Sequence, residues 1–441
     1  MALGPLTGLF GTNSSGKTSL IQFLLLLKQT AESNDRARVL HLGDDKTYVD
    51  LGTLHDVLHN HADPGELEFA LGWKLPEPQT FRNAATEEEQ VVDRLAFEAS
   101  IRRYHQQISV SHFHYRVGEW ALGMTRNPSK SKSPAYGKYE LLTTGFAAFR
   151  SADSSRSRWD LPAPVKCYGF PDETFAYYQN VGFLRDLALQ FEKAFGRCYY
   201  LGPLREYPKR NYQWGGDRPE GVGAKGELAV AALLAARAGE SGPKKATPGH
   251  PPALTLETQV ARWLQQLGLI HSFSVQPIAR NRKDYEVRVK RTADSADVLI
   301  TDVGFGVSQI LPVLVLCYYV PEGSTIILEQ PEIHLHPAVQ GGLADVFIDA
   351  IKSRGVQIIL ESHSEHLLKR LQTRLAQEVL TPEQVKLYFA DFQQGESVLT
   401  PLQLDDFGNI RNWPDGFFGD PFAEAADHLE AEMKRRQRPQ L

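Results

Sequence analysis

Residues 11–18, Gly-Thr-Asn-Ser-Ser-Gly-Lys-Thr, are the feature that most constrains this chain. They fit the G-x-x-x-x-G-K-[ST] pattern of loops that wrap around a phosphate group. Apolar Leu6, Leu9 and Phe10 precede the loop, and residues 19–29 have the composition of a helix. The sequence therefore predicts the strand–loop–helix unit that this pattern requires, and with it an α/β fold.

The loop predicts a nucleoside triphosphate site. Its glycines let successive backbone N–H groups point at phosphate oxygens, and the helix N-terminus behind them adds a partial positive charge. In such loops the lysine, here Lys17, reaches the β- and γ-phosphates, and the hydroxyl of Thr18 binds Mg²⁺. The predicted nucleotide-binding residues of the loop are Gly11, Asn13, Ser14, Ser15, Gly16, Lys17, Thr18 and Ser19.

The composition limits which binding partners and which cellular compartment are expected for this protein. The 441 residues include 48 Lys and Arg against 53 Asp and Glu, a net charge of −5, so no global basic excess favours constitutive binding to nucleic acid. Basic groups at residues 280–291 and 352–354 are more typical of a solvated face. The cysteines, Cys167, Cys198 and Cys317, lack the spacing of metal ligands and are typical of core thiols in a reducing compartment.

No segment of the sequence predicts export or membrane insertion. The N-terminus lacks the basic stretch of a signal peptide, because it runs directly into the phosphate loop. The apolar runs at residues 24–27 and 310–320 are too short to cross a bilayer. We therefore predict a cytoplasmic protein without a membrane partner.

The rest of the chain predicts a nucleotide-binding core, a P-loop sheet flanked by helices, that is interrupted by a β-rich insertion. Alternating apolar residues at 66–71 and the aromatic-rich stretch 108–120 are typical of antiparallel strands, and loops are expected at 127–138 and 151–158. The predicted segments are 1–60, the first part of the core; 61–195, the insertion; 196–295, a return to the core with a helical segment and a flexible linker at 239–252; 296–390, the second part of the core; and 391–441, a C-terminal extension.

Shorter patterns predict individual elements. A helix is expected near 183–195 and a strand at 197–201. Apolar periodicity at 260–267 predicts an amphipathic helix that ends at Gly268, and alternation at 283–291 predicts a strand.

A second group of candidate site residues follows a buried strand. Residues 325–328 have the character of such a strand and are followed by Glu329, Gln330 and, two residues further, Glu332. Ligands bind at the carboxyl ends of strands in open α/β sheets, so these side chains are expected at that edge. A carboxylate there can hold the Mg²⁺ shell, which we assign to Glu329 together with Thr18, and a neighbouring group can polarise the attacking water.

Two further segments complete the predicted site. Upstream, a Gly-rich turn precedes an apolar helix predicted at 310–319, and its N–H groups and the Ser308 hydroxyl form a second anion site that includes Gly306. Downstream, residues 356–364 predict a strand that ends in a polar cluster containing His363. Because this strand is expected beside the other site strands, we assign His363 to the catalytic site.

The order of these motifs resembles that of ABC-type P-loop ATPases. The motifs are the phosphate loop, the Gly/Ser/Gln turn, the acidic strand with Pro-Glu-x-His-Leu-His-Pro, and the strand ending in Ser-His-Ser. The branch that the chain resembles is the one that contains SMC-like repair ATPases and the overcoming-lysogenization-defect (OLD) proteins. Residues 201–206, 328–337 and 413–418 are similar to a bacterial group of uncharacterised predicted AAA/ABC ATPases, some of them linked to phage defence. The resemblance covers most of the chain outside residues 64–160.

The resemblance implies that ATP and Mg²⁺ are held between two copies of the chain. Gly306 and Ser308, in the place of the ABC signature, would contact the γ-phosphate bound by the other copy, and His363 would take the switch-histidine role. It further implies an ATPase that regulates a partner protein, such as a nuclease, or a nucleic-acid transaction, in defence against phage.

The acidic strand departs from the ABC pattern. That pattern ends in Asp-Glu, where this chain has Glu329 and Gln330. Gln330 can orient water but cannot accept a proton, so Glu332 is the alternative base if the chain turns at Pro331. The other role open to Glu332 is to cap the following helix. If Gln330 replaces the base, hydrolysis is slow, and the chain acts as a nucleotide-gated scaffold or sensor.

The ends of the chain depart from the family as well. Only ten residues precede Gly11, where the family has an additional strand or hairpin, so either the start is placed late or that element is absent. The segment after His363 is too short for the nuclease domain of OLD proteins, and a turn is expected at Asp405 and Asp406. A DNA-repair clamp that uses the basic residues at 280–291 is the remaining alternative.

Overall fold

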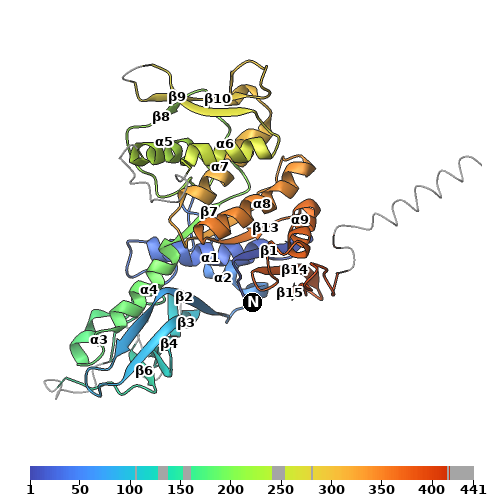
Figure 1. Cartoon of the computed structure of the whole chain (residues 1–441). Helices are drawn as coiled ribbons and strands as arrows, with labels where there is room; N and C mark the ends of the chain where they lie inside the picture. The colour runs from blue at the N-terminus through green and yellow to red at the C-terminus, as the bar shows by residue number, and fades with distance from the viewer. Residues whose placement is uncertain are drawn as a thin grey trace, which may run out of the picture. The chain divides into compact units, whose positions relative to one another are not determined.

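The computed structural model describes residues 1–104, 107–127, 138–151, 160–240, 254–279, 282–414 and 417 (Figure 1). Backbone packing divides the chain into two compact units: unit 1 contains residues 1–18 and 199–441, and unit 2 contains residues 19–198. The loops predicted at 127–138 and 151–158, the linker at 239–252, Arg280 and residues 415, 416 and 418 lie wholly or partly outside the described residues.

Unit 1 is built on a six-stranded mixed sheet. Its strands are β1 (Leu6–Gly11), β7 (Cys198–Leu201), β12 (Thr325–Glu329), β13 (Gln357–Glu361), β14 (Val385–Gln393) and β15 (Glu396–Pro401). Their order in the sheet is β15-β14-β1-β13-β12-β7. β1 pairs in parallel with β13 and β14, β13 pairs in parallel with β12, and β14 and β15 form an antiparallel hairpin. The predicted α/β fold class is confirmed.

Helices pack against this sheet and form the core of unit 1. They include α7 (Phe305–Tyr319), α8 (Pro337–Arg354) and α9 (Glu365–Ala376). Every residue of α7 from Val307 to Tyr318 is buried, and a helix that is apolar around its whole circumference must lie inside the protein. The central strands β12 and β13 each have three consecutive buried apolar residues, Ile-Ile-Leu, as is typical of parallel strands buried on both faces.

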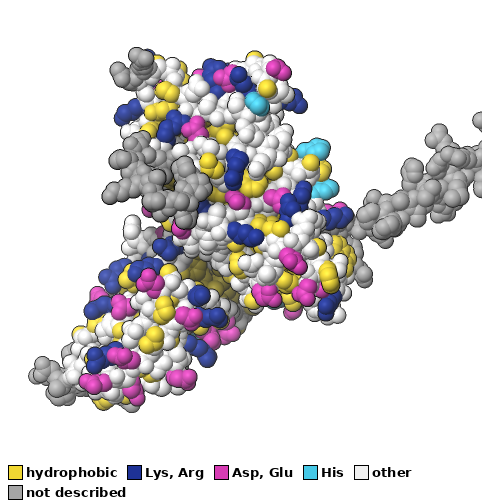
Figure 2. Space-filling model, in the orientation of Figure 1, with side chains coloured by type: hydrophobic (Ala, Val, Ile, Leu, Met, Phe, Trp, Pro, Cys, Tyr) yellow, Lys and Arg dark blue, Asp and Glu magenta, His cyan; other side chains and the backbone are white. Residues whose placement is uncertain are grey.

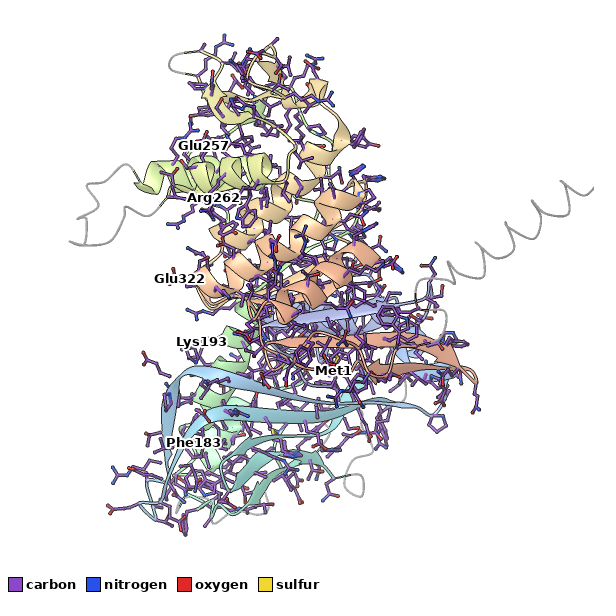
Figure 3. The ribbon with its side chains drawn as sticks, turned by 45° about the vertical axis from the view of Figure 1, so that its right-hand side comes forward. Met1, Phe183, Lys193, Glu257, Arg262 and Glu322 are labelled. Atoms are coloured by element: carbon purple, nitrogen blue, oxygen red, sulfur yellow. The ribbon has the colours of Figure 1, made fainter. Side chains whose placement is uncertain are left out.

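A second layer of unit 1 lies beyond α7. It contains α5 (Ala229–Glu240), α6 (Leu256–Gln266), the short helix η4 (Ile300–Asp302) and the strands β8 (Tyr212–Gln213), β9 (Ser272–Pro277), β10 (Asp284–Lys290) and β11 (Val298–Leu299). α5 and α6 both pack on α7. Glu257, labelled on α6 in Figure 3, accepts a hydrogen bond from the Val275 N–H of β9 at 2.9 Å and so fixes α6 to the small sheet. The predicted helix before Gly268 and strand at 283–291 are confirmed.

Unit 2 is a five-stranded antiparallel sheet with helices. Its strands are β2 (Glu66–Arg82), β3 (Glu89–Tyr104), β4 (Gln107–Val117), β5 (Trp120–Arg126) and β6 (Tyr139–Thr144), each paired with the next. Its helices are α2 (Leu54–Val57), η1 (His59–His61), α3 (Asp172–Tyr177) and α4 (Leu184–Gly196). Phe97 on β3 contacts Phe191 on α4, with ring centroids 5.0 Å apart. These elements confirm the predicted antiparallel strands and the helix near 183–195.

The helix α1 (Lys17–Glu32) explains where the two units divide. Its residues Leu26 and Leu27 are buried in the core of unit 2, together with Leu40. Residues 19–60, which the sequence groups with the nucleotide core, therefore belong to unit 2. The phosphate loop and Thr18 remain in unit 1.

Other sequence features can now be placed. Cys167 and Cys317 are buried, and Cys198 is half-buried, with its Sγ 3.4 Å from the carbonyl oxygen of Ala194. The turn at Asp405 is confirmed, because its Oδ1 accepts hydrogen bonds from the N–H groups of Phe407 and Asn409 at 3.0 and 2.8 Å.

Figure 2 shows Lys and Arg interspersed with Asp and Glu on the visible face, in keeping with the small net charge. Within the described residues, no helix has both the length and the apolar character needed to cross a membrane.

Candidate nucleotide-binding site

β1, the loop after it and α1 form the strand–loop–helix unit that the sequence predicts. β1 ends at Gly11, and α1 begins at Lys17. Gly11 and Gly16 have φ angles of +137° and +87°, which glycine adopts without strain. At Gly11 a Cβ atom would lie 2.0 Å from the carbonyl oxygen of Ala390 on β14, so no side chain fits there.

Lys17 lies inside the loop and is only 3% exposed. Its Nζ donates hydrogen bonds to the carbonyl oxygens of Thr12 at 2.6 Å and Gly11 at 3.2 Å. Burial lowers the pKa of Lys17, and the nearby charge of Glu361 opposes that shift. The ammonium group is therefore held within the loop, where a phosphate would compete with two carbonyl groups for it.

The other predicted loop residues differ in exposure. Ser15 is buried, and its hydroxyl donates to the carbonyl oxygen of Thr12 at 2.8 Å. Asn13, Ser14 and Ser19 are exposed. Hydrogen bonds from the buried side chains of Ser15 and Lys17 thus hold the loop in its conformation, and the exposed side of the loop is accessible to a ligand.

Two glutamates end neighbouring strands beside this loop. Glu329 ends β12, Glu361 ends β13, and the two are opposite each other in the parallel register. The Thr18 hydroxyl donates to Glu361 Oε2 at 2.8 Å, and not to Glu329. Glu329 Oε1 instead accepts a hydrogen bond from the Tyr200 hydroxyl at 2.8 Å. The structure therefore brings Glu361 to Thr18, although the sequence patterns single out only Glu329 for this role.

The two carboxylates share a buried edge of the sheet. Glu329 is 7% exposed and Glu361 is 3% exposed. Burial raises the pKa of Glu329, the charge of Glu361 raises it further, and the hydrogen bond from Tyr200 opposes both. Burial and the two carboxylates likewise raise the pKa of the Tyr200 hydroxyl. Two adjacent acidic groups held out of water are an arrangement that a divalent cation stabilises.

A tight turn follows β12 and brings Glu332 back to the sheet edge. Gln330 has a positive φ of 44°, and its N–H donates to the carbonyl oxygen of Glu361 at 2.9 Å. Glu332 is 6% exposed, and its Oε1 accepts a hydrogen bond from the His363 N–H at 2.7 Å. The alternative in which Glu332 caps the following helix is wrong, because the side chain of His336 accepts from the Ala338 N–H at the start of α8.

Arg205 lies beside Glu332 and is not among the residues predicted for the site. It is 7% exposed, and its Nη2 donates to the carbonyl oxygen of Gln330 at 3.4 Å. Its Nε and Nη1, and Oε2 of Glu332, are buried without a hydrogen-bond partner among the described residues. Burial lowers the pKa of Arg205 to about 10, and the charge of Glu332 opposes the shift. The sequence signal for Arg205 is its place in the Leu-Gly-Pro-Leu-Arg-Glu segment.

Burial also governs the ionisation of Glu332. It raises the pKa of the Glu332 carboxyl, whereas the His363 N–H and, more weakly, the charge of Arg205 lower it. The two charged groups therefore support each other's ionised forms in a buried place.

His363 and the turn after β12 line one pocket. His363 Nε2 lies 4.0 Å from Glu361 Oε1, and burial followed by the charge of Lys17 lowers the pKa of His363. The pocket has a volume of about 250 Å³. Its lining residues are Gln330, Glu332, Ile333, His334, Gln340, His363 and Ser364. All three residues predicted as catalytic therefore face the same space.

Gly306 and Ser308 lie in the first turn of α7. The sequence predicts them in a turn before a helix at 310–319, but α7 already begins at Phe305, with Gly304 as its N-cap. The predicted helix start is wrong because Gly304 provides the extended N-cap conformation and Val307 is already buried. The Ser308 hydroxyl donates to the carbonyl oxygen of Phe305 at 2.8 Å and is engaged within the helix. Neither residue lines the pocket at His363.

Part of unit 1 is similar to a family of ATPase domains. Residues 255–368 match the family described as "AAA ATPase domain", a range that includes β12, β13 and His363. Residues 380–427 match a family described as "Protein of unknown function (DUF3696)". No curated protein matches the chain.

The solved structures that are similar to this chain include SMC head domains, at low sequence identity. The SMC head domain from Thermotoga maritima is 9% identical, with 91% of this chain and 92% of that chain covered and a TM-score of 0.37. An SmcHead bound to the C-winged helix domain of ScpA is 10% identical, with 92% of each chain covered and a TM-score of 0.40. The Smc head from Pyrococcus furiosus is 9% identical, with 98% and 94% covered and a TM-score of 0.36.

Proposed function

We propose that this chain binds ATP and Mg²⁺ at the phosphate loop and hydrolyses ATP slowly, as a dimer that controls a partner. The observation that carries the proposal is the meeting of three groups at one edge of the unit 1 sheet. These are the loop with Lys17 and Thr18, the carboxylates of Glu329 and Glu361, and the pocket of Glu332 and His363. The match of residues 255–368 to an ATPase domain supports it independently of the loop.

The loop supplies the phosphate site in this proposal. Backbone N–H groups of the open side of the loop and the N-terminus of α1 favour negative charge. Lys17 then exchanges its bonds to the carbonyls of Thr12 and Gly11 for charge-assisted bonds to phosphate oxygens, which are stronger. The geometry of the loop is thus compatible with tight phosphate binding.

The residues around Thr18 fit Mg²⁺. The donor atoms are all oxygens, from the hydroxyl of Thr18 and the carboxylates of Glu361 and Glu329, and hard oxygen ligands are the ones that Mg²⁺ prefers. Bound there, the ion would neutralise charge that develops on the transferred phosphoryl group. Glu361 is the carboxylate in contact with Thr18, and we therefore propose it as a metal-binding residue together with Glu329.

Glu332 is the residue proposed to accept the proton from the attacking water. It is buried, bonded to the His363 N–H, and it lines the pocket with Gln330, whose amide can orient water. A general base needs a pKa near the working pH, and burial raises the pKa of Glu332 in that direction. His363, half-exposed beside Glu361, is proposed to contact the γ-phosphate.

A second proposal is a nucleotide-gated scaffold with little hydrolysis. Gln330 favours it, because an amide occupies the position where the ABC pattern has a carboxylate. The hydrogen bond from His363 to Glu332 favours it as well, because one oxygen of the alternative base is already engaged. In this case the ATP-bound dimer is long-lived, and ATP acts as a signal.

Dimerisation, the partner and the biological setting rest on the resemblance to SMC- and OLD-like ATPases. Gly306 and Ser308 would then approach the nucleotide of the second copy, with a nuclease or a nucleic acid as the controlled partner, in phage defence in the cytoplasm. The DNA-clamp alternative has weaker support. In the described part of the basic segment, Arg288 forms a hydrogen bond with Glu286 at 2.6 Å, which offsets its charge.

ATP turnover by the purified 441-residue chain tests the proposal. Light scattering with and without ATP and Mg²⁺ gives the oligomeric state in the same experiment. Lys17→Ala is the variant that removes phosphate binding, and Glu332→Gln tests the base. Turnover lost in both variants supports the ATPase. ATP-dependent dimers without turnover support the scaffold, and absence of ATP binding overturns both.

A further inference from the structure

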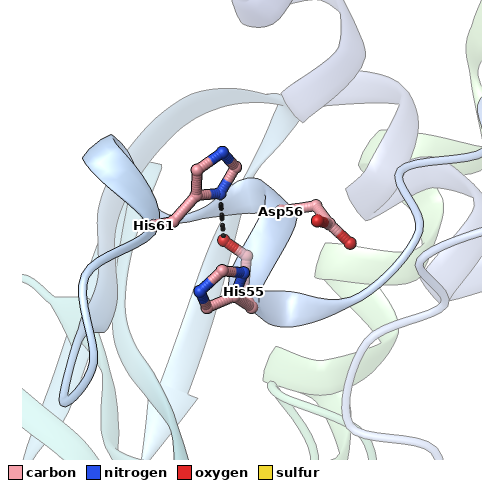
Figure 4. A group of neighbouring side chains, drawn as sticks. All are labelled: His55, Asp56 and His61. Atoms are coloured by element: carbon pink, nitrogen blue, oxygen red, sulfur yellow. Dashed lines mark hydrogen bonds between the residues drawn. The ribbon is translucent and has the colours of Figure 1, made fainter.

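Unit 2 contains a cluster of potential metal ligands that the nucleotide site does not use. His55 and Asp56 lie on α2, and His61 lies at the end of η1, six residues after His55 (Figure 4). One ligand atom from each of the three residues lies within 4.8 Å of the others. All three side chains are exposed. Exposed side chains can make the small rotations that a common ligand would require, within the limits set by their hydrogen bonds.

The ring of His61 is oriented by a backbone group. Its Nδ1 lies 3.0 Å from the carbonyl oxygen of His55. A carbonyl oxygen can only accept a hydrogen bond, so in the neutral ring the proton is on Nδ1 and the lone pair is on Nε2. Metal-binding histidines commonly donate their other ring N–H to a carbonyl or carboxylate in this way.

Asp56 is held in place by a different set of bonds. Its Oδ2 accepts hydrogen bonds from the Thr53 N–H at 2.8 Å and the Thr53 hydroxyl at 2.7 Å. These bonds lower the pKa of Asp56. Both end on Oδ2, which leaves Oδ1 of an ionised carboxylate for a cation.

We propose that His55, Asp56 and His61 bind one divalent transition-metal ion of the Zn²⁺ class. Two imidazole nitrogens and one carboxylate oxygen suit Zn²⁺ and its neighbours in the first transition row, and not Mg²⁺ or Ca²⁺, which prefer oxygen ligands. In a tetrahedral site with ligand bonds of about 2.0–2.2 Å, the ligand atoms lie about 3.3–3.6 Å apart. Small side-chain rotations would have to bring together three atoms that now lie within 4.8 Å of one another. The ion would join α2 to the end of η1.

His59 provides a matched control within the same segment. Its Nε2 is 2.9 Å from Nδ2 of Asn60, which donates to it, so this nitrogen is already engaged. It is not part of the cluster of ligand atoms. A site of defined geometry therefore depends on His55 and His61, whereas a merely histidine-rich surface depends on all three histidines alike.

Cobalt titration of the 441-residue chain tests the proposal, with Co²⁺ as a spectroscopic probe for Zn²⁺. We expect one Co²⁺ per chain, visible absorption of a nitrogen- and oxygen-bound ion, and displacement by Zn²⁺. Loss of a group that merely supports a ligand weakens binding by about 10–100-fold, so His55→Ala and His61→Ala should weaken it by at least about tenfold. Asp56→Asn should weaken it too, and His59→Ala should leave it unchanged.

Controls separate the loss of the site from a loss of folding. Because the three side chains are exposed, circular dichroism and ATP binding of every variant should match those of the parent chain. Equal affinity in the parent, His55→Ala and His61→Ala chains would overturn the proposal. Equal loss in His59→Ala would also overturn it, because the binding would then come from the histidine-rich surface in general.

Discussion

Two neighbouring strands of unit 1 end in the same four residues, yet their terminal carboxylates have different partners. β12 ends in Ile-Ile-Leu-Glu at 326–329, and β13 ends in Ile-Ile-Leu-Glu at 358–361. In the parallel register each residue lies opposite its identical counterpart. Glu361 accepts a hydrogen bond from Thr18, whereas Glu329 accepts one from Tyr200.

The difference teaches that position in the sheet, and not local sequence, gives each carboxylate its partner. β13 lies between β1 and β12, so Glu361 is one strand from the phosphate loop and Glu329 is two strands from it. On its other side β12 is followed by β7, which carries Tyr200. The same four residues can thus serve two roles because the sheet order places different neighbours beside them.

The largest expected effect is at Glu361. Glu361→Gln should lower Mg²⁺-dependent ATP turnover by roughly 100-fold, a typical loss when one charge-stabilising group is removed from an active site. Its effect should be non-additive with Thr18→Val, because the two side chains are hydrogen-bonded. A double-mutant cycle on turnover measures this coupling. Coupling of Thr18 to Glu329 instead would reverse the assignment of the two carboxylates.

A smaller effect is expected at Arg205, which acts through Glu332. The charge of Arg205 lowers the pKa of Glu332, so Arg205→Met should raise that pKa. A base must be ionised to act, so the acid limb of the pH–rate profile should move to higher pH. Turnover should fall about tenfold at pH 6 and less at pH 8. Arg205→Lys, which retains a positive charge, should restore much of the profile.

The Arg205 prediction needs a control for folding. Removing one member of a buried charge pair is strongly destabilising, by about 3–5 kcal/mol, because the other charge stays buried. Arg205→Met combined with Glu332→Gln should therefore have a larger free energy of unfolding than Arg205→Met alone. A parallel drop of turnover at every pH would mean that Arg205 serves only the fold.

Tyr200 offers a milder change on the Glu329 side. Tyr200→Phe removes one hydrogen bond, worth about 1 kcal/mol or roughly fivefold. The Tyr200 bond lowers the pKa of Glu329, so its loss should favour the protonated carboxyl and raise the Mg²⁺ concentration for half-maximal turnover, most clearly at low pH. Tyr388→Phe is the control, because that hydroxyl bonds the backbone of Ala2. Equal Mg²⁺ requirements in all three chains would contradict the role of Glu329.

Much of this architecture could be predicted from sequence because its signals are local. The loop at 11–18, the apolar strands and the amphipathic helix before Gly268 each depend on residues close together in the chain. The boundary between the two units is harder to predict from the sequence, because the burial of Leu26 in the core of unit 2 depends on strands that come much later in the chain.

The contacts of Glu361 and Arg205 depend on sheet order and on a turn, which local patterns do not encode. Glu361 meets Thr18 only because β13 is inserted between β1 and β12. Arg205 meets Glu332 only because the chain reverses at Gln330, whose φ is positive. The repeat of Ile-Ile-Leu-Glu in the sequence is the one signal that could have drawn Glu361 into the predicted site.

The smallest expected effects test whether β12 and β13 are equivalent apart from their terminal partners. Ile327 and Ile359 lie opposite each other and are 1% and 2% exposed. Ile327→Val and Ile359→Val should each lower the free energy of unfolding by about 0.5–1.5 kcal/mol, to a similar extent, and leave turnover unchanged. Chemical denaturation measures the first and the ATPase assay the second. If one variant lost turnover and the other did not, the strands themselves, and not only the partners of Glu329 and Glu361, would differ in function.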